Sequence, residues 1–205
     1  MNKIKKIIFL IIMTILIGVL IYDKYPRVSY NKILDIQERY LTEGEYTIGK
    51  DIAEGVYDVE VIEGNILFNK MLIEKGRKVL SYPFMINNII LIEGSGKIKI
   101  TPAKQDKLVL ANNSYKIESS GNYKVGKSID NGKYVLTYYC DDSKYKDKKP
   151  FIQILNSKNG DIIESYDFKD ASSYNIELNE AQTLQVYKGL FEDYKNYYIL
   201  LQRTE

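Results

Sequence analysis

The sequence predicts an all-β fold: two tandem, small antiparallel β-sandwich-like domains that follow an N-terminal transmembrane helix and a short stalk helix. Two observations lead to this prediction. The phrase YTIGKDIAEGVY at Tyr46 to Tyr57 returns as YKVGKSIDNGKY at Tyr123 to Tyr134, and such a recurrence indicates two copies of one structural unit. Short β-prone runs separated by glycine-containing breaks follow both copies, and this spacing is typical of an antiparallel sandwich or barrel.

The N-terminal segment Met1 to Tyr22 has the composition of an export signal or a membrane anchor. Three lysines precede an unbroken apolar run from Ile7 to Tyr22, which is slightly shorter than the roughly 20 residues of a usual membrane span. No small-x-small cleavage motif precedes Asp23, so a retained anchor is favoured and a cleaved signal peptide is the alternative. The lysines favour a cytoplasmic N-terminus. The predicted localisation is therefore the cell membrane, single-pass, with the C-terminal domains extracellular.

Residues 23–44 are predicted to link the anchor to the β domains. Apolar residues at helical spacings predict one short helix from Asn31 to Leu41, which Gly44 ends. The two β domains are expected at residues 45–118 and 119–205. The boundary is placed near Ser119 because a Ser-Ser-Gly break stands there.

The strands of each domain are predicted from short β-prone runs between turn residues. In the first domain they are Gly55 to Val61, Asn65 to Phe68, Met71 to Glu74, Lys78 to Tyr82, Met85 to Ile92 and Lys97 to Thr101. A further strand is expected in the link between the domains, at Lys107 to Leu110. In the second domain they are Lys133 to Tyr139, Phe151 to Leu155, Asp161 to Asp167, Tyr174 to Leu178, Thr183 to Tyr187 and Tyr197 to Gln202.

Two local patterns add detail to the second domain. The dipeptide Asn159-Gly160 predicts a hairpin with a type I′ turn, which needs positive φ at both central residues. A weaker echo also relates the ends of the domains, because NIILIEGSGKIKI from Asn88 resembles NIELNEAQTLQVY from Asn175.

The residues that recur in the repeated phrase are interpreted as structural turns. The glycines are expected where the backbone takes positive φ, and the lysines are expected to point to solvent, with a ligand-binding role for the lysines as the alternative. These turn positions are Gly49, Lys50, Gly55 and Tyr57 in the first copy, and Gly126, Lys127, Gly132 and Tyr134 in the second.

The composition excludes several classes of function. The chain has no histidine, and Cys140 is its only cysteine, so imidazole or thiolate metal sites and Ser-His-Asp triads are unavailable within one chain. No metal, no cofactor and no catalysis are therefore expected, and Cys140 is interpreted as a strand-end filler. Of 29 basic residues three belong to the anchor, so 26 remain against 27 acidic residues and the outer part has a net charge of −1. A nearly neutral domain lacks the basic surface that nucleic-acid binding needs.

Tyrosines are the candidate binding residues, because the chain has 19 tyrosines and no tryptophan. Tyrosine rings can stack on sugar rings, although tyrosine is also a good strand former that needs no ligand. The tyrosines whose neighbours indicate loops or strand ends form the candidate surface: Tyr138, Tyr139, Tyr145, Tyr194, Tyr197 and Tyr198.

The phrase GKDIAEGVYDVEV, followed by EGSGKIKITPAK, resembles a repeat in an uncharacterised family of exported envelope proteins from low-GC Gram-positive bacteria. The second copy departs from that repeat, because Ser128 stands where the first copy has aspartate. The resemblance implies an extracytoplasmic location and a β-rich fold, and it assigns no catalytic residues.

The predicted function is a membrane-anchored extracytoplasmic binding or structural module of the bacterial cell envelope. Its expected partner is cell-wall polymer or another envelope protein, besides the membrane itself. The alternative is a surface enzyme or enzyme inhibitor with a carboxylate site in one domain, since paired carboxylates are sufficient for chemistry such as glycoside hydrolysis.

Overall fold

The structure is a computed structural model, and it describes residues 34–141, 143, 147–169, 171–188 and 196–204. Within these ranges the chain is all-β, with its strands in two sheets, and residues from Leu34 onward form one compact unit. None of the helices in these ranges has the length and apolar composition that a membrane crossing requires. The predicted anchor, Met1 to Tyr22, lies outside the described residues.

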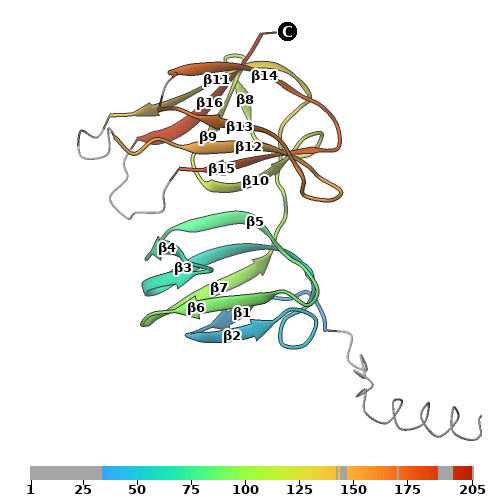
Figure 1. The fold of residues 1–205 in the computed structure, drawn as a ribbon, viewed down its shortest axis with the longest axis vertical. Helices are drawn as coiled ribbons and strands as arrows, with labels where there is room; N and C mark the ends of the chain where they lie inside the picture. The colour runs from blue at the N-terminus through green and yellow to red at the C-terminus, as the bar shows by residue number, and fades with distance from the viewer. Residues whose placement is uncertain (1–33, 142, 144–146, 170, 189–195, 205) are drawn as a thin grey trace, which may run out of the picture. The chain divides into compact units, whose positions relative to one another are not determined.

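The strands fall into two groups, here called the first and the second repeat (Figure 1). The first repeat contains β1 (Arg39–Leu41), β2 (Gly44–Thr47), β3 (Gly55–Phe68), β4 (Met71–Glu74), β5 (Lys78–Phe84), β6 (Ile89–Glu93) and β7 (Gly96–Pro102). The second contains β8 (Leu110–Ala111), β9 (Ser114–Ile117), β10 (Ser120–Lys124), β11 (Gly132–Cys140), β12 (Phe151–Asn156), β13 (Ile162–Asp167), β14 (Ser173–Leu178), β15 (Gln182–Tyr187) and β16 (Tyr197–Arg203).

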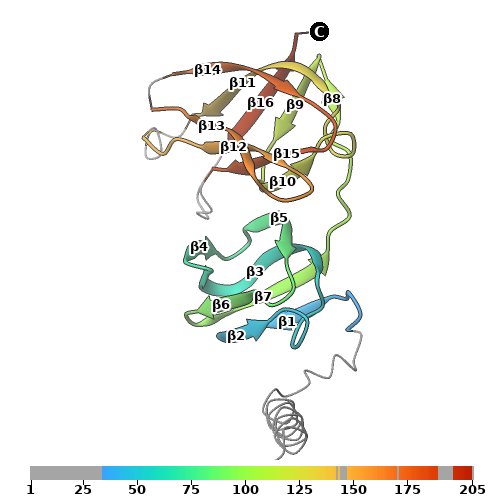
Figure 2. The ribbon, with the colours of Figure 1, turned by 45° about the vertical axis from the view of Figure 1, so that its right-hand side comes forward.

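The two repeats share one order of strand pairing. In the first repeat β1, β7, β3 and β5 are neighbours in that order, and in the second repeat β9, β16, β11 and β14 are neighbours in the same order, as Figure 2 also shows for β9, β16 and β11. The strand β2 pairs with β6, which pairs with the end of β3, and this end pairs with β4. The same relation links β10, β15, β12 and β13.

The main difference between the repeats is the long strand β3. Its first part and its end pair with different strands, and the register shifts between Val61 and Glu63. In the second repeat these two parts are separate strands, β11 and β12, with the charged segment Asp141 to Pro150 between them. The two strands predicted at Gly55 to Val61 and Asn65 to Phe68 are therefore one strand, because a bulge carries the chain through the Glu-Gly break.

Each repeat has its own hydrophobic core. One cluster of buried side chains is built from the strands β1 to β7, and a second cluster is built from β9 to β16. The alternation in β7 is as predicted: Ile98 and Ile100 are fully buried, whereas Lys97 and Lys99 are only half-buried on the other side. Most predicted strands are confirmed to within a few residues, and β4 has the predicted bounds.

The stalk helix predicted over Asn31 to Leu41 is wrong from residue 34 onward. Residues 34–38 have no regular structure, and the next three residues form β1, which pairs antiparallel with β7. Leu41 is buried, whereas Tyr40 faces solvent. The chain forms a strand here in spite of the helical spacing of its apolar residues. As a strand, β1 supplies hydrogen-bond partners to the backbone N–H and C=O groups at the edge of β7, which a helix cannot do.

Two further expectations need correction. The strand predicted from Met85 begins only at Ile89, because the chain turns at Asn87, where φ is 66°. The strand predicted at Lys107 to Leu110 is wrong except for its last residue. The chain instead forms β8 and β9, which pair with each other and through β9 with β16. The chain from Leu110 onward thus pairs with strands of the second repeat.

The predicted hairpin at Asn159-Gly160 joins β12 and β13, but its turn is not type I′. Gly160 has a φ of 76°, whereas Asn159 does not take positive φ. The Asn156 N–H donates to the Asp161 oxygen, and the Gly160 N–H donates to the Asn156 oxygen. Four residues therefore form the loop, with glycine at the one left-handed position.

The sequence similarity between the segments that begin at Asn88 and Asn175 aligns strands that are not structurally equivalent. Because β2 pairs with β6 and β10 pairs with β15, β6 corresponds to β15. The strand β14, which contains Asn175, corresponds to β5, since each pairs with the strand that follows the repeated phrase. Each segment contains two successive strands with alternating buried residues, and these successive strands pair with other strands and not with each other.

The repeated phrase has the same backbone geometry in both copies. The N–H of Gly49 donates to the oxygen of Ile52 over 2.7 Å, and that of Gly126 donates to Ile129 over the same distance. The φ angles of the two glycines are 89° and 83°.

The other repeated positions are also alike. The Tyr57 hydroxyl donates to the oxygen of Ala53, and the Tyr134 hydroxyl donates to that of Asp130. Lys50 and Lys127 are exposed, as expected. Among the glycines, Gly132 has a φ of 149°, whereas Gly55 lacks the expected positive φ and lies under Ile36 instead.

Candidate functional site

The structure describes four of the six candidate tyrosines, since Tyr145 and Tyr194 lie outside the described residues. Tyr197 is buried at 3% exposure, Tyr138 is half-buried, and the two ring centroids lie 6.1 Å apart. Tyr138 also packs edge-on against Phe168, and its hydroxyl accepts a hydrogen bond from Lys149. Both rings thus pack against neighbouring aromatic side chains, and Tyr138 keeps part of its surface exposed.

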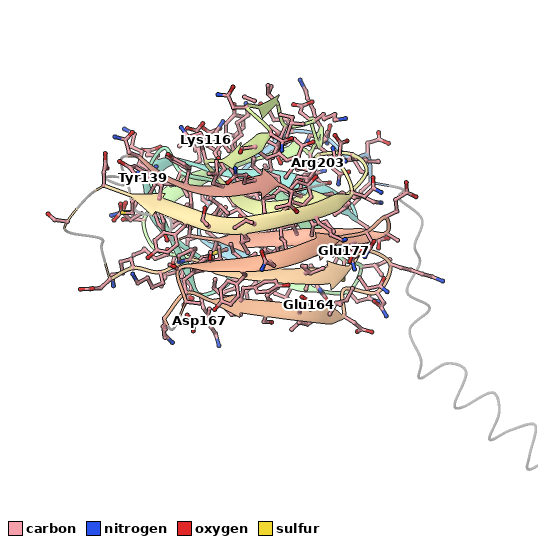
Figure 3. The ribbon with its side chains drawn as sticks, turned by 90° about the horizontal axis from the view of Figure 1, so that it is seen from above. Lys116, Tyr139, Glu164, Asp167, Glu177 and Arg203 are labelled. Carbon is pink, nitrogen blue, oxygen red and sulfur yellow. The ribbon has the colours of Figure 1, made fainter. Side chains whose placement is uncertain are left out.

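Tyr139 on β11 and Tyr198 on β16 are direct cross-strand partners, of which Tyr139 is exposed and Tyr198 half-buried. Their rings stack with centroids 5.1 Å apart, and the Lys116 ammonium lies 4.5 Å from the centroid of Tyr198. Lys116 and Tyr139 are labelled at the surface in Figure 3. Because Tyr198 already has Tyr139 and Lys116 as ring partners, Tyr139 is the better candidate for stacking on a ligand.

The two repeats are joined by a short pairing of β5 with β10, here called the junction. The pairing is parallel, with Val79 opposite Ser120 and Leu80 opposite Gly121. A Cβ atom on Gly121 would lie 2.5 Å from the backbone oxygen of Leu80, closer than non-bonded atoms approach. Glycine is therefore required for the two strands to come this close.

A chain of polar contacts crosses the junction. The Ser81 N–H donates to Oδ1 of Asp58 over 2.8 Å, and the oxygen of Ser81 accepts from Nδ2 of Asn122 over 3.1 Å. The Asn122 Oδ1 then accepts from Nε2 of Gln185. Ser81 has a φ of 53°, an uncommon conformation for a residue other than glycine. Such strain persists where its surroundings hold it, and it is frequent at binding sites.

A groove lies beside the junction, formed by two neighbouring cavities of about 200 Å³ and about 150 Å³. Both are lined by Ser81, Gln105 and Asn122. The first repeat contributes apolar side chains to the larger cavity, among them Pro83 and Met85. The second repeat contributes hydroxyl, amide and ammonium groups to it from β10, β15 and the loop between β12 and β13. The groove thus has one apolar wall and one polar wall.

The two cavities of the groove differ in charge. Lys124 and Lys158 are the charged residues that line the larger one, and neither ammonium forms an ion pair with another described residue. Asp58 and Asp106 line the smaller one, together with Lys107. Lys107 is paired, because its Nζ lies 2.8 Å from Oδ1 of Asp130.

Burial near the junction raises the pKa of two groups, the Asp58 carboxyl and the Tyr123 hydroxyl. It raises the pKa of Asp58, although the N–H of Ser81 and the nearby Lys78 act in the opposite direction. It also raises the pKa of the Tyr123 hydroxyl, with the charge of Asp58 as a smaller cause in the same direction. Tyr123 is 5% exposed, whereas its counterpart Tyr46 is only half-buried. The second tyrosine is thus buried where the two repeats meet.

Sequence reasoning missed the groove because it compared what the two copies share. The positions of Asn122 and Lys124 are occupied by Glu45 and Thr47 in the first copy, so the polar wall is a property of the second copy alone. The positions at which the two copies differ were therefore the sequence signal that could have revealed the polar wall. The partner wall remained undetectable because it depends on the pairing of β5 with β10, which no local pattern reveals.

In the described ranges no group of three or more His, Cys, Asp or Glu side chains is arranged to hold a metal ion. Comparison with known proteins adds no further guide, because no protein-family model, no curated protein and no solved structure matches this chain.

Lys188 is a buried cation outside the groove, directly after β15. It is 7% exposed, its Nζ donates to the backbone oxygen of Tyr197, and it lies 5.2 Å from the centroid of the Tyr197 ring. Burial lowers the pKa of Lys188 to about 8, and the charge of Arg77 acts in the same direction.

This pKa predicts that stability rises between pH 7 and pH 9. Between a folded-state pKa of about 8 and the ordinary value of 10.5, the unfolded chain binds more protons than the folded chain, so the free energy of unfolding increases with pH. The expected gain from this one group is about 1 kcal/mol. Lys188→Met is expected to flatten the dependence, which thermal unfolding at pH 7, 8 and 9 measures. Equal slopes for the two proteins would refute the prediction.

Proposed function

We propose that this chain is a membrane-anchored, extracytoplasmic binding or structural module of the bacterial cell envelope, with no catalytic step of its own. Its partner is cell-wall polymer or another envelope protein. The lysines and the apolar run of Met1 to Tyr22 support a single membrane anchor with a cytoplasmic N-terminus.

The proposal includes two tandem β-sandwich-like domains, one for each repeat. The common pairing order of the strands and the two separate core clusters support this arrangement. The resemblance of GKDIAEGVYDVEV to an envelope-protein repeat supports the same location. Because β5 of the first repeat pairs with β10 of the second, the two repeats together offer a binding partner more surface than one repeat does.

The observation that carries the binding function is the groove beside the junction. Concave sites that combine apolar walls with a few polar groups are the usual places where proteins hold ligands. Lys124 and Lys158 bring to this groove ammonium groups that form no ion pair with another described residue. Because two ammonium groups without an ion-pair partner among the described residues border this cavity, we assign the binding role to the groove.

Retention on envelope material tests the proposal. The full-length chain in detergent is incubated with purified cell wall and, separately, with solubilised membrane proteins of the source cells. Saturable retention on the wall, or recovery of one membrane protein, is expected. Tyr139→Ala separates the two candidate surfaces: unchanged retention of this variant supports the groove, whereas lost retention would move the binding site to the exposed tyrosine. Absence of retention on both materials would contradict a binding module.

The proposed location has a separate test. Protease added to intact cells is expected to degrade the β domains, since they lie outside the membrane in this proposal. Domains that stay intact until the cells are lysed would show that they face the cytoplasm.

A further inference from the structure

We propose that the groove holds a hydroxyl-rich ligand that carries one acidic group, such as a unit of a polyol phosphate or a uronic acid. This inference rests on the proposed binding function, and it names the chemistry of the ligand for the same groove. The polar wall, the apolar wall and the size of the groove each support one part of it.

The acidic group is assigned from the charges of the larger cavity. Lys124 on β10 and Lys158 on the loop between β12 and β13 approach this cavity from different elements, and no carboxylate lines it. An ammonium group that borders a cavity without a counter-ion favours an anionic ligand, and the gain grows as the ligand displaces water. Phosphate and carboxylate oxygens both accept hydrogen bonds from lysine.

The hydroxyl groups are assigned from the neutral side chains of the polar wall. Ser157 Oγ and Thr183 Oγ1 lie 2.7 Å apart, so one donates to the other and the pair keeps further capacity to donate and accept. The Gln105 side-chain amide forms no hydrogen bond with another described residue. Hydroxyls and amides that can donate and accept suit the hydroxyls of a polyol, which also do both.

Gln105 also shows local strain. It has a φ of 54°, so Gln105 and Ser81 line the same groove in left-handed conformations. A left-handed conformation of a residue other than glycine is energetically unfavourable. Other interactions of the fold must therefore offset the cost of both residues. Their common position indicates that the shape of the groove is held for a purpose other than packing.

The apolar wall suits the carbon skeleton of such a ligand. Pro83 and Met85 project from the first repeat, and Met85 is 49% exposed. A flexible, exposed methionine can adapt to the C–H face of a sugar or polyol. The cavity of about 200 Å³ is smaller than the usual ligand pocket. One unit of a polymer therefore fits, with an affinity near the millimolar range because few atoms are in contact.

A titration monitored by NMR tests the inference. The full-length, ¹⁵N-labelled chain is kept in lauryldimethylamine oxide, since that detergent has neither a sugar nor a phosphate head group. Glycerol 3-phosphate, glucuronate and glycerol are added in turn. The two acids are expected to shift the backbone signals of Ser81, Asn122, Lys124 and Ser157, and glycerol is expected to shift them at least tenfold more weakly.

Variants and salt test whether the lysines recognise the acid. Lys124→Gln and Lys158→Gln are each expected to weaken binding three- to tenfold. Lys127→Gln, an exposed turn lysine that does not line the groove, should bind as the unaltered chain does. If a variant fails to fold, added salt gives the same answer, because screening should weaken the acids and leave glycerol unchanged.

The outcomes separate the two proposals. Binding of one acid alone identifies the source as phosphate or carboxylate, and binding of both leaves the shared chemistry as stated. Equal shifts from glycerol, or no loss in either lysine variant, would overturn the assignment of an acidic ligand. Absence of any shift, with retention on envelope material intact, would overturn the ligand class and leave the proposed function standing.

Discussion

Replacing Gly64 with alanine is expected to lower the free energy of unfolding by about 3 kcal/mol or more. Gly64 lies in β3 just after the bulge, opposite Gly96, with a φ of 70°. A Cβ atom there would lie 2.0 Å from the backbone oxygen of Ser95 and 2.9 Å from the Cα of Gly96. Both obstacles are backbone atoms, so no side-chain rotation relieves the overlap, and the pairing of β3 with β7 must open locally.

Gly76→Ala is the matched control for this change. Gly76 has a φ of 79°, close to that of Gly64, and a Cβ atom there would meet nothing within 4 Å. It should therefore show only the cost of the left-handed conformation, about 1 kcal/mol. Urea unfolding of the two variants, followed by circular dichroism, measures the difference. If both lose the same stability, close approach of the strands is not what requires glycine at Gly64.

The bulge also shows how far local sequence patterns predict this fold. A Glu-Gly break normally ends a strand, so the sequence pattern places residues 62–64 between two strands. The structure continues the strand, because Gly64 and Gly96 let the two chains pass close to each other. The alternation of apolar and polar side chains on both sides of the break correctly predicts strands there, since side-chain periodicity is a local property. The continuity was missed because it depends on β7, which lies far along the chain.

The errors at the two ends of the first repeat have the same origin. Residues 34–41 have apolar residues at helical spacings, yet the chain adds β1 to the edge of β7. Residues 107–110 are β-prone, yet the pairing with β16 begins only with Ser114. In both cases the partner strand lies more than fifty residues away, and tertiary pairing overrides a weak local preference.

The repeated phrase was interpreted correctly as a structural unit for the opposite reason. Its hydrogen bonds connect residues three to five positions apart, such as Gly49 with Ile52 and Tyr57 with Ala53. Their geometry is therefore encoded within the phrase itself, and the second copy reproduces it. The groove has no such local code, since its walls come from β10, β15 and a loop of one repeat and from the β5 region of the other.

Gly121→Ala is expected to open the junction and to cost about 3 kcal/mol, while the two cores remain folded. Gly121 and its counterpart Gly44 share a φ of 153°, so the conformational cost of alanine is the same at both. Only at Gly121 does the new Cβ atom meet a neighbouring strand, at 2.5 Å from the oxygen and 2.8 Å from the nitrogen of Leu80. At Gly44 the nearest atoms belong to Tyr46 and lie 3.6 Å away. Gly44→Ala should therefore lose only about 1 kcal/mol.

Hydrogen exchange and ligand binding distinguish opening of the junction from general loss of stability. In Gly121→Ala the amides of β5 and β10 at the junction should exchange faster, while the buried strand β11 keeps its protection. The pKa of Tyr123 should fall slightly, since the charge of Asp58 in the first repeat is one cause of its rise and opening of the junction moves Asp58 away. Because the groove has one wall from each repeat, Gly121→Ala should also lose the binding of glycerol 3-phosphate, and Gly44→Ala should retain it. Retained binding with an open junction would mean that the polar wall of the second repeat suffices, and that the first repeat contributes no part of the site.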